Sequence, residues 1–211
     1  GSSSSFVVGV LHALYAFKGK HVSAETLAQD ACRIEIEILK KPIGKQDQYA
    51  AAYGGFNYLQ FNPDKSVYID PIICQFGIKE RLENNLLLLY TGITRSSDTI
   101  LVKQNRNMQE SSQKQGIMAQ MVTIADEMRE SLRKNKLDTF GELLDENWRL
   151  KKQMADTISS PTIDGWYAVA KENGAVGGKL LGAGGGGFLL FFAPQKHHRK
   201  IIKALPMLRP T

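Results

Sequence analysis

The sequence predicts an α+β fold in which helices accompany short antiparallel strands. Much of the 211-residue chain consists of stretches whose apolar residues recur every three to four positions, which is typical of amphipathic helices. Two short segments around a turn, 56–61 and 67–69, alternate like the strands of a β-hairpin. Unbroken apolar runs at 86–90 and 188–192 are typical of buried strands. This order of elements favours sheets with helices packed on one side.

The first part of the chain reads as three helices and the hairpin. A helix is expected over 4–17, ending near Gly19, and a second over 23–39, with Ser23 as its N-cap. Pro42 and Gly44 interrupt the pattern before a short helix at 46–53. The apolar stripe of the second helix consists of Leu27, Ala31, Ile34 and Ile38. Asp70-Pro71 predicts a domain boundary, which gives domains 1–71 and 72–211.

The second part begins with the strand at 86–90. Helices are expected at 97–107, 116–135, 137–155 and 160–173, with Pro161 in the first turn of the last of these, where proline is tolerated. A glycine-rich loop between two strands follows, and then a helix at 196–205. The last residues, 208–211, predict no closing element.

Composition and charge narrow the classes of function. Hydrophobic residues make up 43% and charged residues 23% of the chain, which is ordinary for a soluble globular protein. The net charge of +6 is spread over short clusters that are expected to be solvated surface, so neither a nucleic acid nor a membrane is an expected partner. Cys32 and Cys74 have no metal-ligand or pairing pattern and are predicted to be buried free thiols, which fits a reducing cytoplasm.

Two segments predict close contact with an anionic ligand. The stretch 182–187 holds five glycines in six residues, and glycine loses the most backbone entropy on folding. Such a cluster therefore predicts backbone that approaches a ligand or another backbone closely. At the other end of the chain, serines 2–5 lead into an apolar helix. The free N–H groups and the dipole of a helix N-terminus form a phosphate site.

Two carboxylates complete a plausible set for phosphoryl transfer. Asp47 lies just inside a helix start, where the helix dipole alone would favour it. Glu35 lies beside the apolar stripe of the preceding helix, whereas Glu37 is expected to be exposed. Phosphoryl transfer needs backbone donors around phosphates, oxygen ligands for a metal, and a base that orients the attacking hydroxyl. The chain has no Walker A, dinucleotide-binding or HExxH pattern, and its four histidines share no spacing.

Taken together, these residues resemble the GHMP small-molecule kinases. Gly1-Ser2-Ser3 looks like the end of the family's phosphate loop, P-x-x-x-G-L-G-S-S, and the stretch 179–187 looks like its late glycine motif. The resemblance covers essentially the whole chain. It implies a two-domain fold, with a remnant of a ribosomal protein S5 domain 2-like N-terminal domain followed by a ferredoxin-like C-terminal domain.

The resemblance also implies roles for particular residues. Asp47 matches the catalytic Asp of the sugar-kinase members, and Ser3 and Glu35 match the ligands of Mg²⁺. Lys45, Arg95 and Lys179 are candidates for offsetting charge on the substrate phosphate or the transferring group. The residues expected to bind ATP are Gly1, Ser2, Ser3, Ser4, Gly182, Gly184, Gly185 and Gly186.

Within the family, three segments look like D-glycero-D-manno-heptose 7-phosphate kinases, namely 35–39, 42–55 and 91–95. This implies ATP-dependent phosphorylation of the anomeric hydroxyl of a phosphorylated heptose in the cytoplasm, giving a sugar bisphosphate and ADP. Two alternative functions are kept. The protein is then either a kinase for another sugar, such as fucose or galactose, or an inactive binding or regulatory protein. A decarboxylase of the same fold is disfavoured by the sugar-kinase-like context at 44–48.

The sequence departs from the family pattern at its ends. Family members begin with a long segment that supplies sheet strands, sugar contacts and part of the adenine pocket, and this sequence starts within the phosphate loop. We therefore expect the chain alone to be inactive and the full-length protein to bind ATP. A sheet edge left without its neighbouring strands could pair with another copy to form a homodimer.

Overall fold

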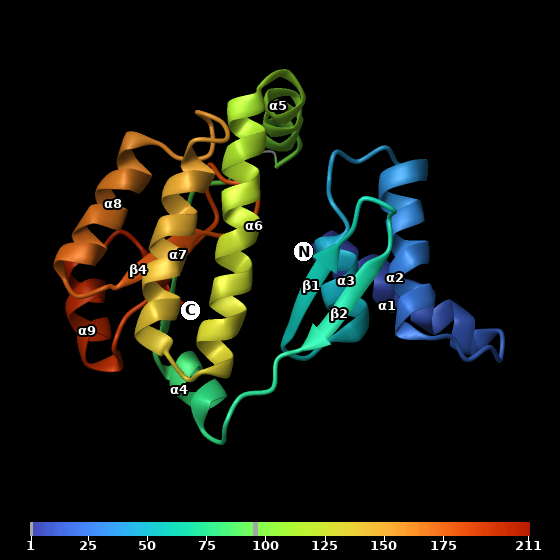
Figure 1. Ribbon diagram of the computed structural model, residues 1–211, viewed down its shortest axis with the longest axis horizontal. Coiled ribbons are helices and arrows are strands. Elements are labelled where there is room, and N and C mark those ends of the chain that lie inside the picture. Colours follow the sequence, from blue (N-terminus) through green and yellow to red (C-terminus); the bar gives the residue numbers. More distant parts are fainter. Residues whose placement is uncertain (1, 95–96) are drawn as a thin grey trace. The chain divides into compact units, whose positions relative to one another are not determined.

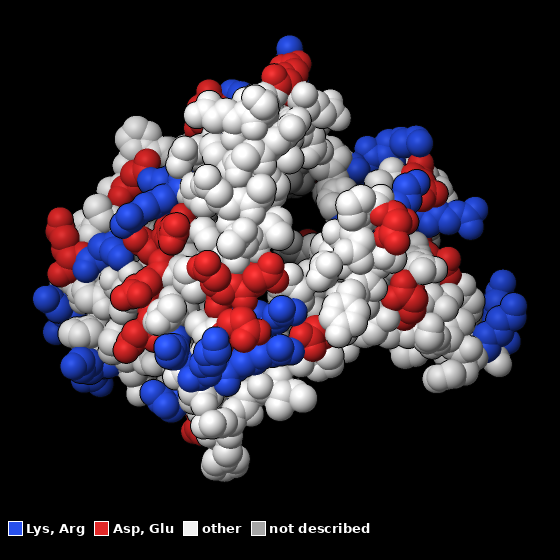
Figure 2. Space-filling model, in the orientation of Figure 1, with Lys and Arg blue, Asp and Glu red and all other residues white. Residues whose placement is uncertain are grey.

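A computed structural model describes residues 2–94 and 97–211 (Figure 1). The chain forms two compact units, residues 1–72 and 73–211. Both combine helices with antiparallel strands, as the α+β prediction requires. Within the described residues, no helix is both long and apolar enough to cross a membrane. On the face seen in Figure 2, lysine and arginine alternate with acidic side chains rather than forming one continuous basic surface.

The first unit packs three α-helices against a hairpin. The Ser23 hydroxyl caps its second helix by accepting a hydrogen bond from the Thr26 N–H at 3.1 Å, as predicted. In the hairpin, Tyr58 lies opposite Asp70. The elements are α1 (Ser2–Phe17), α2 (Ala24–Cys32), the π-helical segment η1 (Arg33–Ile38), α3 (Gln46–Tyr53), β1 (Asn57–Phe61) and β2 (Val67–Pro71).

The π-helical segment corrects the prediction of one regular helix over 23–39. A π-helix closes its hydrogen bonds over five residues rather than four and therefore rotates less per residue. Ile38, expected on the buried stripe, is 63% exposed, whereas Leu27 and Ala31 are buried. Glu35 lies within this segment and is only 1% exposed. Single π turns inside helices occur often at functional sites.

The second unit is built on a four-stranded antiparallel sheet with the strand order β4-β5-β3-β6. This order, with its helical connections, is the ferredoxin-like arrangement that the resemblance implied. Figure 1 shows α8 beside α9 and α6 beside α7. The elements are α4 (Ile78–Asn84), β3 (Leu86–Tyr90), α5 (Ser97–Glu110), α6 (Ser112–Arg133), α7 (Leu137–Lys152), α8 (Pro161–Glu172), β4 (Gly177–Leu180), β5 (Phe188–Phe192), α9 (Gln195–Ala204) and β6 (Arg209–Pro210).

One face of this sheet forms the main core of the second unit. Leu87 and Leu89 pair with Phe191 and Leu189, and all four side chains are buried. They pack with Ile163 and Tyr167 of α8 and with Ile201 of α9. The apolar run at 86–90 is therefore buried on one face only, because Leu86, Leu88 and Tyr90 on the other face are half-buried.

Strand β4 allows α7 to approach the sheet closely. A Cβ atom at Gly177 would lie 2.0 Å from the carbonyl oxygen of Gly141 on α7, so β4 has no room for a side chain at this position. The aromatic rings of Phe140 and Phe192 continue this contact between α7 and β5. The glycine at position 177 is therefore a packing requirement of the sheet.

Three features of the structure differ from expectation. Helix α4 was not predicted, because its seven residues carry too few apolar positions to show a period. Strand β6 closes the sheet where no closing element was expected, pairing Arg209 with Tyr90. Both cysteines are free, but Cys74 is only half-buried because it lies in the irregular segment between β2 and α4, whereas Cys32 is buried in the first unit.

Candidate functional site

A buried carboxylate ties together three elements of the first unit. Ser3, in the first turn of α1, donates its hydroxyl hydrogen to Glu35 Oε1 at 2.8 Å. Gln48 of α3 donates through Nε2 to the other carboxylate oxygen at 2.6 Å. Residues that are distant in sequence therefore meet at one carboxyl group. The structure brings together Ser3 and Glu35, the pair that the resemblance had implied.

The environment keeps this carboxylate ionised. Burial alone would raise the pKa of Glu35, but hydrogen bonds from Ser4, Ser3 and Gln48 lower it, and the Lys41 ammonium adds to that effect. The hydrogen bonds and the charge outweigh burial, so the pKa lies below its ordinary value. Glu35 therefore carries a fixed negative charge beside the N-terminus of α1.

The donor set at this carboxylate fits Mg²⁺. A hydroxyl and a carboxylate are hard oxygen ligands, and Mg²⁺ is commonly held by one or two carboxylates together with substrate phosphates and water. Gln48 is 0% exposed, and its Oε1 has no hydrogen-bond partner among the described residues, which leaves a buried acceptor close to Glu35. The described residues contain no cluster of three or more His, Cys, Asp or Glu side chains suited to a metal. A cation at this place would depend on phosphate oxygens for its other ligands.

Asp47 lies half-buried in the first turn of α3, directly before Gln48. A cavity of about 430 Å³ opens at this helix start, between Gly44, Lys45 and Gln46 on one side and the turn of the hairpin on the other. The lining residues from the hairpin are Phe61, Asn62, Lys65 and Ser66. Lys45, a predicted substrate residue, donates to the carbonyl of Lys65 across this cavity at 3.4 Å. There is room for a small ligand beside the helix start that carries Asp47.

The glycine-rich loop of the second unit packs its backbone against two other segments. A Cβ atom at Gly186 would lie 2.4 Å from the carbonyl oxygen of Ile93, and one at Gly184 would lie 2.8 Å from Cα of Ile158. The N–H of Gly185, predicted to bind nucleotide, instead donates to Ile158 O at 2.9 Å. Gly185 is buried, whereas Gly182 is exposed. The glycines therefore serve close backbone contact, and the binding of nucleotide by this loop stays a prediction.

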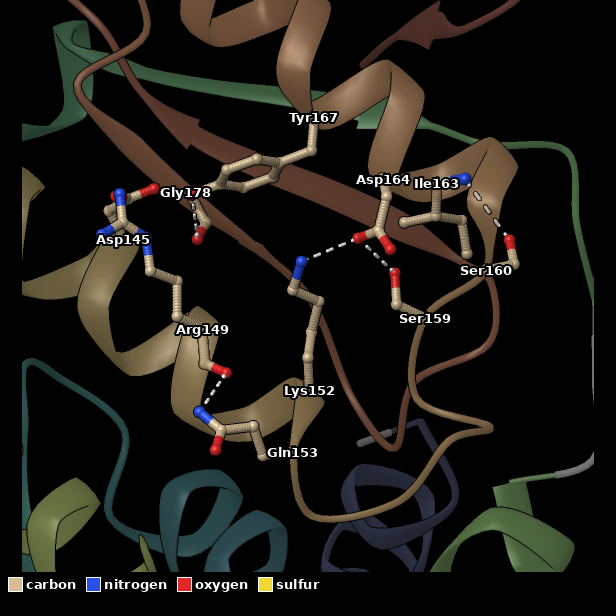
Figure 3. Close-up of polar contacts among 10 residues, drawn as sticks. All are labelled: Asp145, Arg149, Lys152, Gln153, Ser159, Ser160, Ile163, Asp164, Tyr167 and Gly178. Carbon is tan, nitrogen blue, oxygen red and sulfur yellow. Dashed lines mark hydrogen bonds and ion pairs between the residues drawn. The ribbon is translucent and has the colours of Figure 1, made fainter.

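Side chains of α7 and α8 fix the segment that receives this loop (Figure 3). Asp164 accepts hydrogen bonds from Lys152 Nζ at 2.9 Å and from Ser159 Oγ at 3.0 Å. The Ser160 hydroxyl caps α8 by accepting from the Ile163 N–H. Ile158, whose carbonyl holds Gly185, directly precedes these anchored residues. These side chains therefore fix the segment whose Ile158 carbonyl holds the loop.

A second network joins the same two helices to β4. Tyr167 Oη donates to Asp145 Oδ1 at 2.6 Å and lies 3.2 Å from the carbonyl oxygen of Gly178 (Figure 3). Arg149 pairs with the other Asp145 oxygen at 2.6 Å. Burial, followed by the bond to Asp145, raises the pKa of Tyr167 far above its ordinary value, so the phenol stays a donor. This network stabilises the strand that leads into the glycine-rich loop.

Substituting Gly186 tests whether the close approach to Ile93 is needed. We expect Gly186→Ala to lower the free energy of unfolding by about 1–3 kcal/mol, because the Ile93 carbonyl cannot move without shifting the loop. Urea unfolding of the purified protein measures this change. Gly165→Ala on the exposed side of α8 is the matched control, since its Cβ would meet no atom within 4 Å. The control should be neutral or stabilise by about 0.5–1 kcal/mol; equal losses in both variants would contradict the packing role.

Of the remaining predicted site residues, three lie in the part of the chain that the structure describes and two lie outside it. Ser2 and Ser4 lie in the first turn of α1, and Ser4 is buried against Glu35. Lys179 lies on β4 just before the glycine-rich loop. Gly1 and Arg95 lie outside the described residues. Gln48 was missed as a site residue from the sequence, because no local pattern marks a polar residue at a helix start as buried.

Two family descriptions match this chain. "GHMP kinases N terminal domain" matches residues 1–55, and "GHMP kinases C terminal" matches residues 128–206. The chain belongs to the GHMP kinase family. Together the two matches cover more than half of it. The Ser3–Glu35 contact lies within the first matched region and the glycine-rich loop within the second.

Relatives of this GHMP chain include kinases for sugars. It is 34% identical to the D-glycero-alpha-D-manno-heptose 7-phosphate kinase of Campylobacter jejuni over 97% of the chain and 60% of that protein. It is 26% identical to the bifunctional fucokinase/GDP-fucose pyrophosphorylase of Arabidopsis thaliana over 87% of the chain and 18% of that protein. The crystal structure of a D-glycero-D-manno-heptose 1-phosphate kinase from Bacteroides thetaiotaomicron matches with a TM-score of 0.68 and 26% identity, over 99% of this chain and 57% of that one. The chain thus spans about 60% of the length of the heptose kinase.

Proposed function

We propose that the full-length protein transfers the γ-phosphoryl group of ATP to the anomeric hydroxyl of D-glycero-D-manno-heptose 7-phosphate. The products are a sugar bisphosphate and ADP. The observation that carries this proposal is the contact of Ser3 with the buried, ionised Glu35 at the start of α1. The heptose assignment rests on the relative that is 34% identical, which is named as a heptose 7-phosphate kinase.

The residues of the first unit suit distinct parts of this reaction. Ser3 and Glu35 would hold Mg²⁺, which would supply positive charge against the ATP phosphates. The N–H groups at the start of α1 bind phosphate oxygens, because they have no partner within the helix and the helix dipole favours negative charge there. Gln48 keeps the Glu35 carboxylate in a single orientation through its 2.6 Å hydrogen bond.

Asp47 acts on the acceptor hydroxyl. Asp47 lies in the first turn of α3, and its carboxylate is assigned to accept the proton of the C1 hydroxyl or to orient that proton. The Lys45 ammonium at the cavity beside this helix start offsets negative charge on the acceptor. The γ-phosphorus then bonds to the C1 oxygen while its bond to the bridging oxygen that stays on ADP breaks.

A kinase for a sugar without a phosphate is the second candidate. Similarity to the fucokinase of Arabidopsis thaliana over 87% of the chain favours it. Fucose carries no phosphate ester before the reaction, so its binding would not need a lysine or arginine side chain to compensate that charge. The two candidates share the same roles for Ser3, Glu35 and Asp47 and differ only in the acceptor.

A coupled ADP-release assay on the full-length protein tests the proposal. The acceptors compared are heptose 7-phosphate, the unphosphorylated heptose, fucose, galactose and mevalonate. We expect turnover to depend on heptose 7-phosphate, with ³¹P NMR showing a new phosphate on C1. Turnover with fucose alone would support the second candidate, and turnover with mevalonate alone would contradict both.

A further inference from the structure

Two lysines next to the glycine-rich loop lie without a counter-charge. Lys179 is half-buried on β4, and Lys151 is half-buried in the last turn of α7. In residues 2–94 and 97–211, neither Nζ atom lies within 4 Å of a carboxylate oxygen. Lys151 Nζ instead donates to Oε1 of Gln104 on α5 at 3.0 Å, and Gln104 is only 8% exposed. Strand β4 packs against α7, and the charge of Lys179 acts on Lys151, so the two cations and the buried amide lie in one region.

This arrangement costs stability in the absence of a ligand. Burial disfavours an ammonium ion unless an opposite charge compensates it, and two ammonium ions repel each other. Burial lowers the pKa of Lys179, and burial together with the charge of Lys179 lowers that of Lys151 to about 8. The dipole of α7 offsets part of the cost for Lys151, which lies at the helix C-terminus, but not for Lys179 on a strand.

We propose that Lys151, Lys179 and Gln104 form a binding site for one phosphate group of a substrate, at the entrance to the glycine-rich loop. Lysine binds phosphate as a point charge, and the Gln104 amide adds N–H donors beside it. The exposed Gly182, which opens the glycine-rich loop, follows Lys179 by three residues along the chain. The proposal deepens the proposed kinase function and rests on it for the identity of the ligand.

The phosphate group has two sources with the same chemistry. It is either the ester that the acceptor sugar already carries or a phosphate of the nucleotide. Both are multiply charged anions with oxygen acceptors. Either would compensate the positive charges of Lys151 and Lys179 and raise the pKa of each lysine toward its ordinary value.

Methionine substitutions in the full-length protein test the site directly. Lys179→Met and Lys151→Met keep a long apolar stem and remove one charge each. We expect Lys179→Met to raise the Tm of the ligand-free protein by about 2–4 °C, because an uncompensated buried charge is lost. Lys151→Met should raise it less, because it also removes the hydrogen bond to the buried Gln104. We also expect each substitution to reduce at least tenfold the apparent affinity for inorganic phosphate, measured from the rise in Tm with phosphate concentration. Lys179→Arg should retain the response to phosphate.

Lys200→Met is the matched control, because Lys200 is exposed on α9 of the same unit. It should change neither the Tm nor the response to phosphate. A wild-type response to phosphate in both Lys151→Met and Lys179→Met would overturn the proposal, whatever their Tm. These readouts involve no turnover, so they stay valid if the protein proves to be a kinase for another acceptor or inactive.

The KM values then separate the two sources. A tenfold or greater rise in KM for heptose 7-phosphate, with KM for ATP changed less than twofold, identifies the acceptor phosphate. The reverse pattern identifies the nucleotide. Both KM values unchanged in both variants would overturn the assignment of this site to a substrate phosphate.

Discussion

The full-length Asp47→Asn protein is expected to turn over about 10²–10⁴-fold more slowly than wild type, with little change in KM. The amide keeps the size of the side chain but cannot accept the proton of the attacking hydroxyl. Steady-state kinetics of ADP release at saturating ATP and acceptor measure the effect. The loss should be in kcat, because Asp47 is assigned to the chemical step and not to binding.

Asp138→Asn is the matched control for this experiment. Asp138 is exposed in the first turn of α7, which is the same position relative to its helix as Asp47 in α3. Both substitutions remove a carboxylate that interacts with a helix dipole, which contributes about 0.3–1 kcal/mol to stability. If both variants lose similar stability and both keep wild-type kcat, Asp47 only stabilises its helix.

Glu35→Gln should lower kcat/KM for Mg–ATP by about 100-fold or more, since even residues that only support a metal ligand are worth about 10–100-fold. The new glutamine oxygen still accepts from Ser3, and a turn of the Gln48 amide lets its unpartnered Oε1 accept from the new NH₂ group, so the loss reflects the missing charge at the metal rather than unfolding. Titration of activity with MgCl₂ measures the effect, and higher Mg²⁺ should restore part of it.

Glu37→Gln provides the control on the same π-helical segment. Glu37 is exposed, whereas Glu35 is 1% exposed. Its substitution should change kcat/KM less than twofold. An unchanged Mg²⁺ dependence in Glu35→Gln would contradict the assignment of Glu35 to the metal.

Local signals in the sequence predicted much of the fold. The Ser23 cap and the break at Pro42 and Gly44 act over a few residues, and α2 and α3 begin where these signals place them. The π turn at 33–38 left no such signal, because the apolar spacing before it is that of an α-helix. Strand β6 has only two residues and depends on pairing with β3. No local sequence pattern could therefore predict it.

The candidate site shows the same division between local and long-range information. The residue types at Ser3, Glu35 and Asp47 predicted phosphate and metal chemistry, but only the tertiary structure shows that Ser3 contacts Glu35 and that Gln48 completes the group. The glycine run at 182–187 predicted close contact of its backbone, but the sequence did not identify the segments that it contacts. Its partners are the backbones of Ile93 and Ile158, which the chain brings there from distant segments.

The site at the start of α1 is tested most directly by a crystal structure of the full-length protein with Mn²⁺ and a non-hydrolysable ATP analogue. The anomalous signal of Mn²⁺ should lie about 2.0–2.3 Å from both Ser3 Oγ and a Glu35 carboxylate oxygen, with analogue phosphate oxygens completing its coordination. A manganese ion bound to the analogue with neither Ser3 nor Glu35 among its ligands would contradict the account.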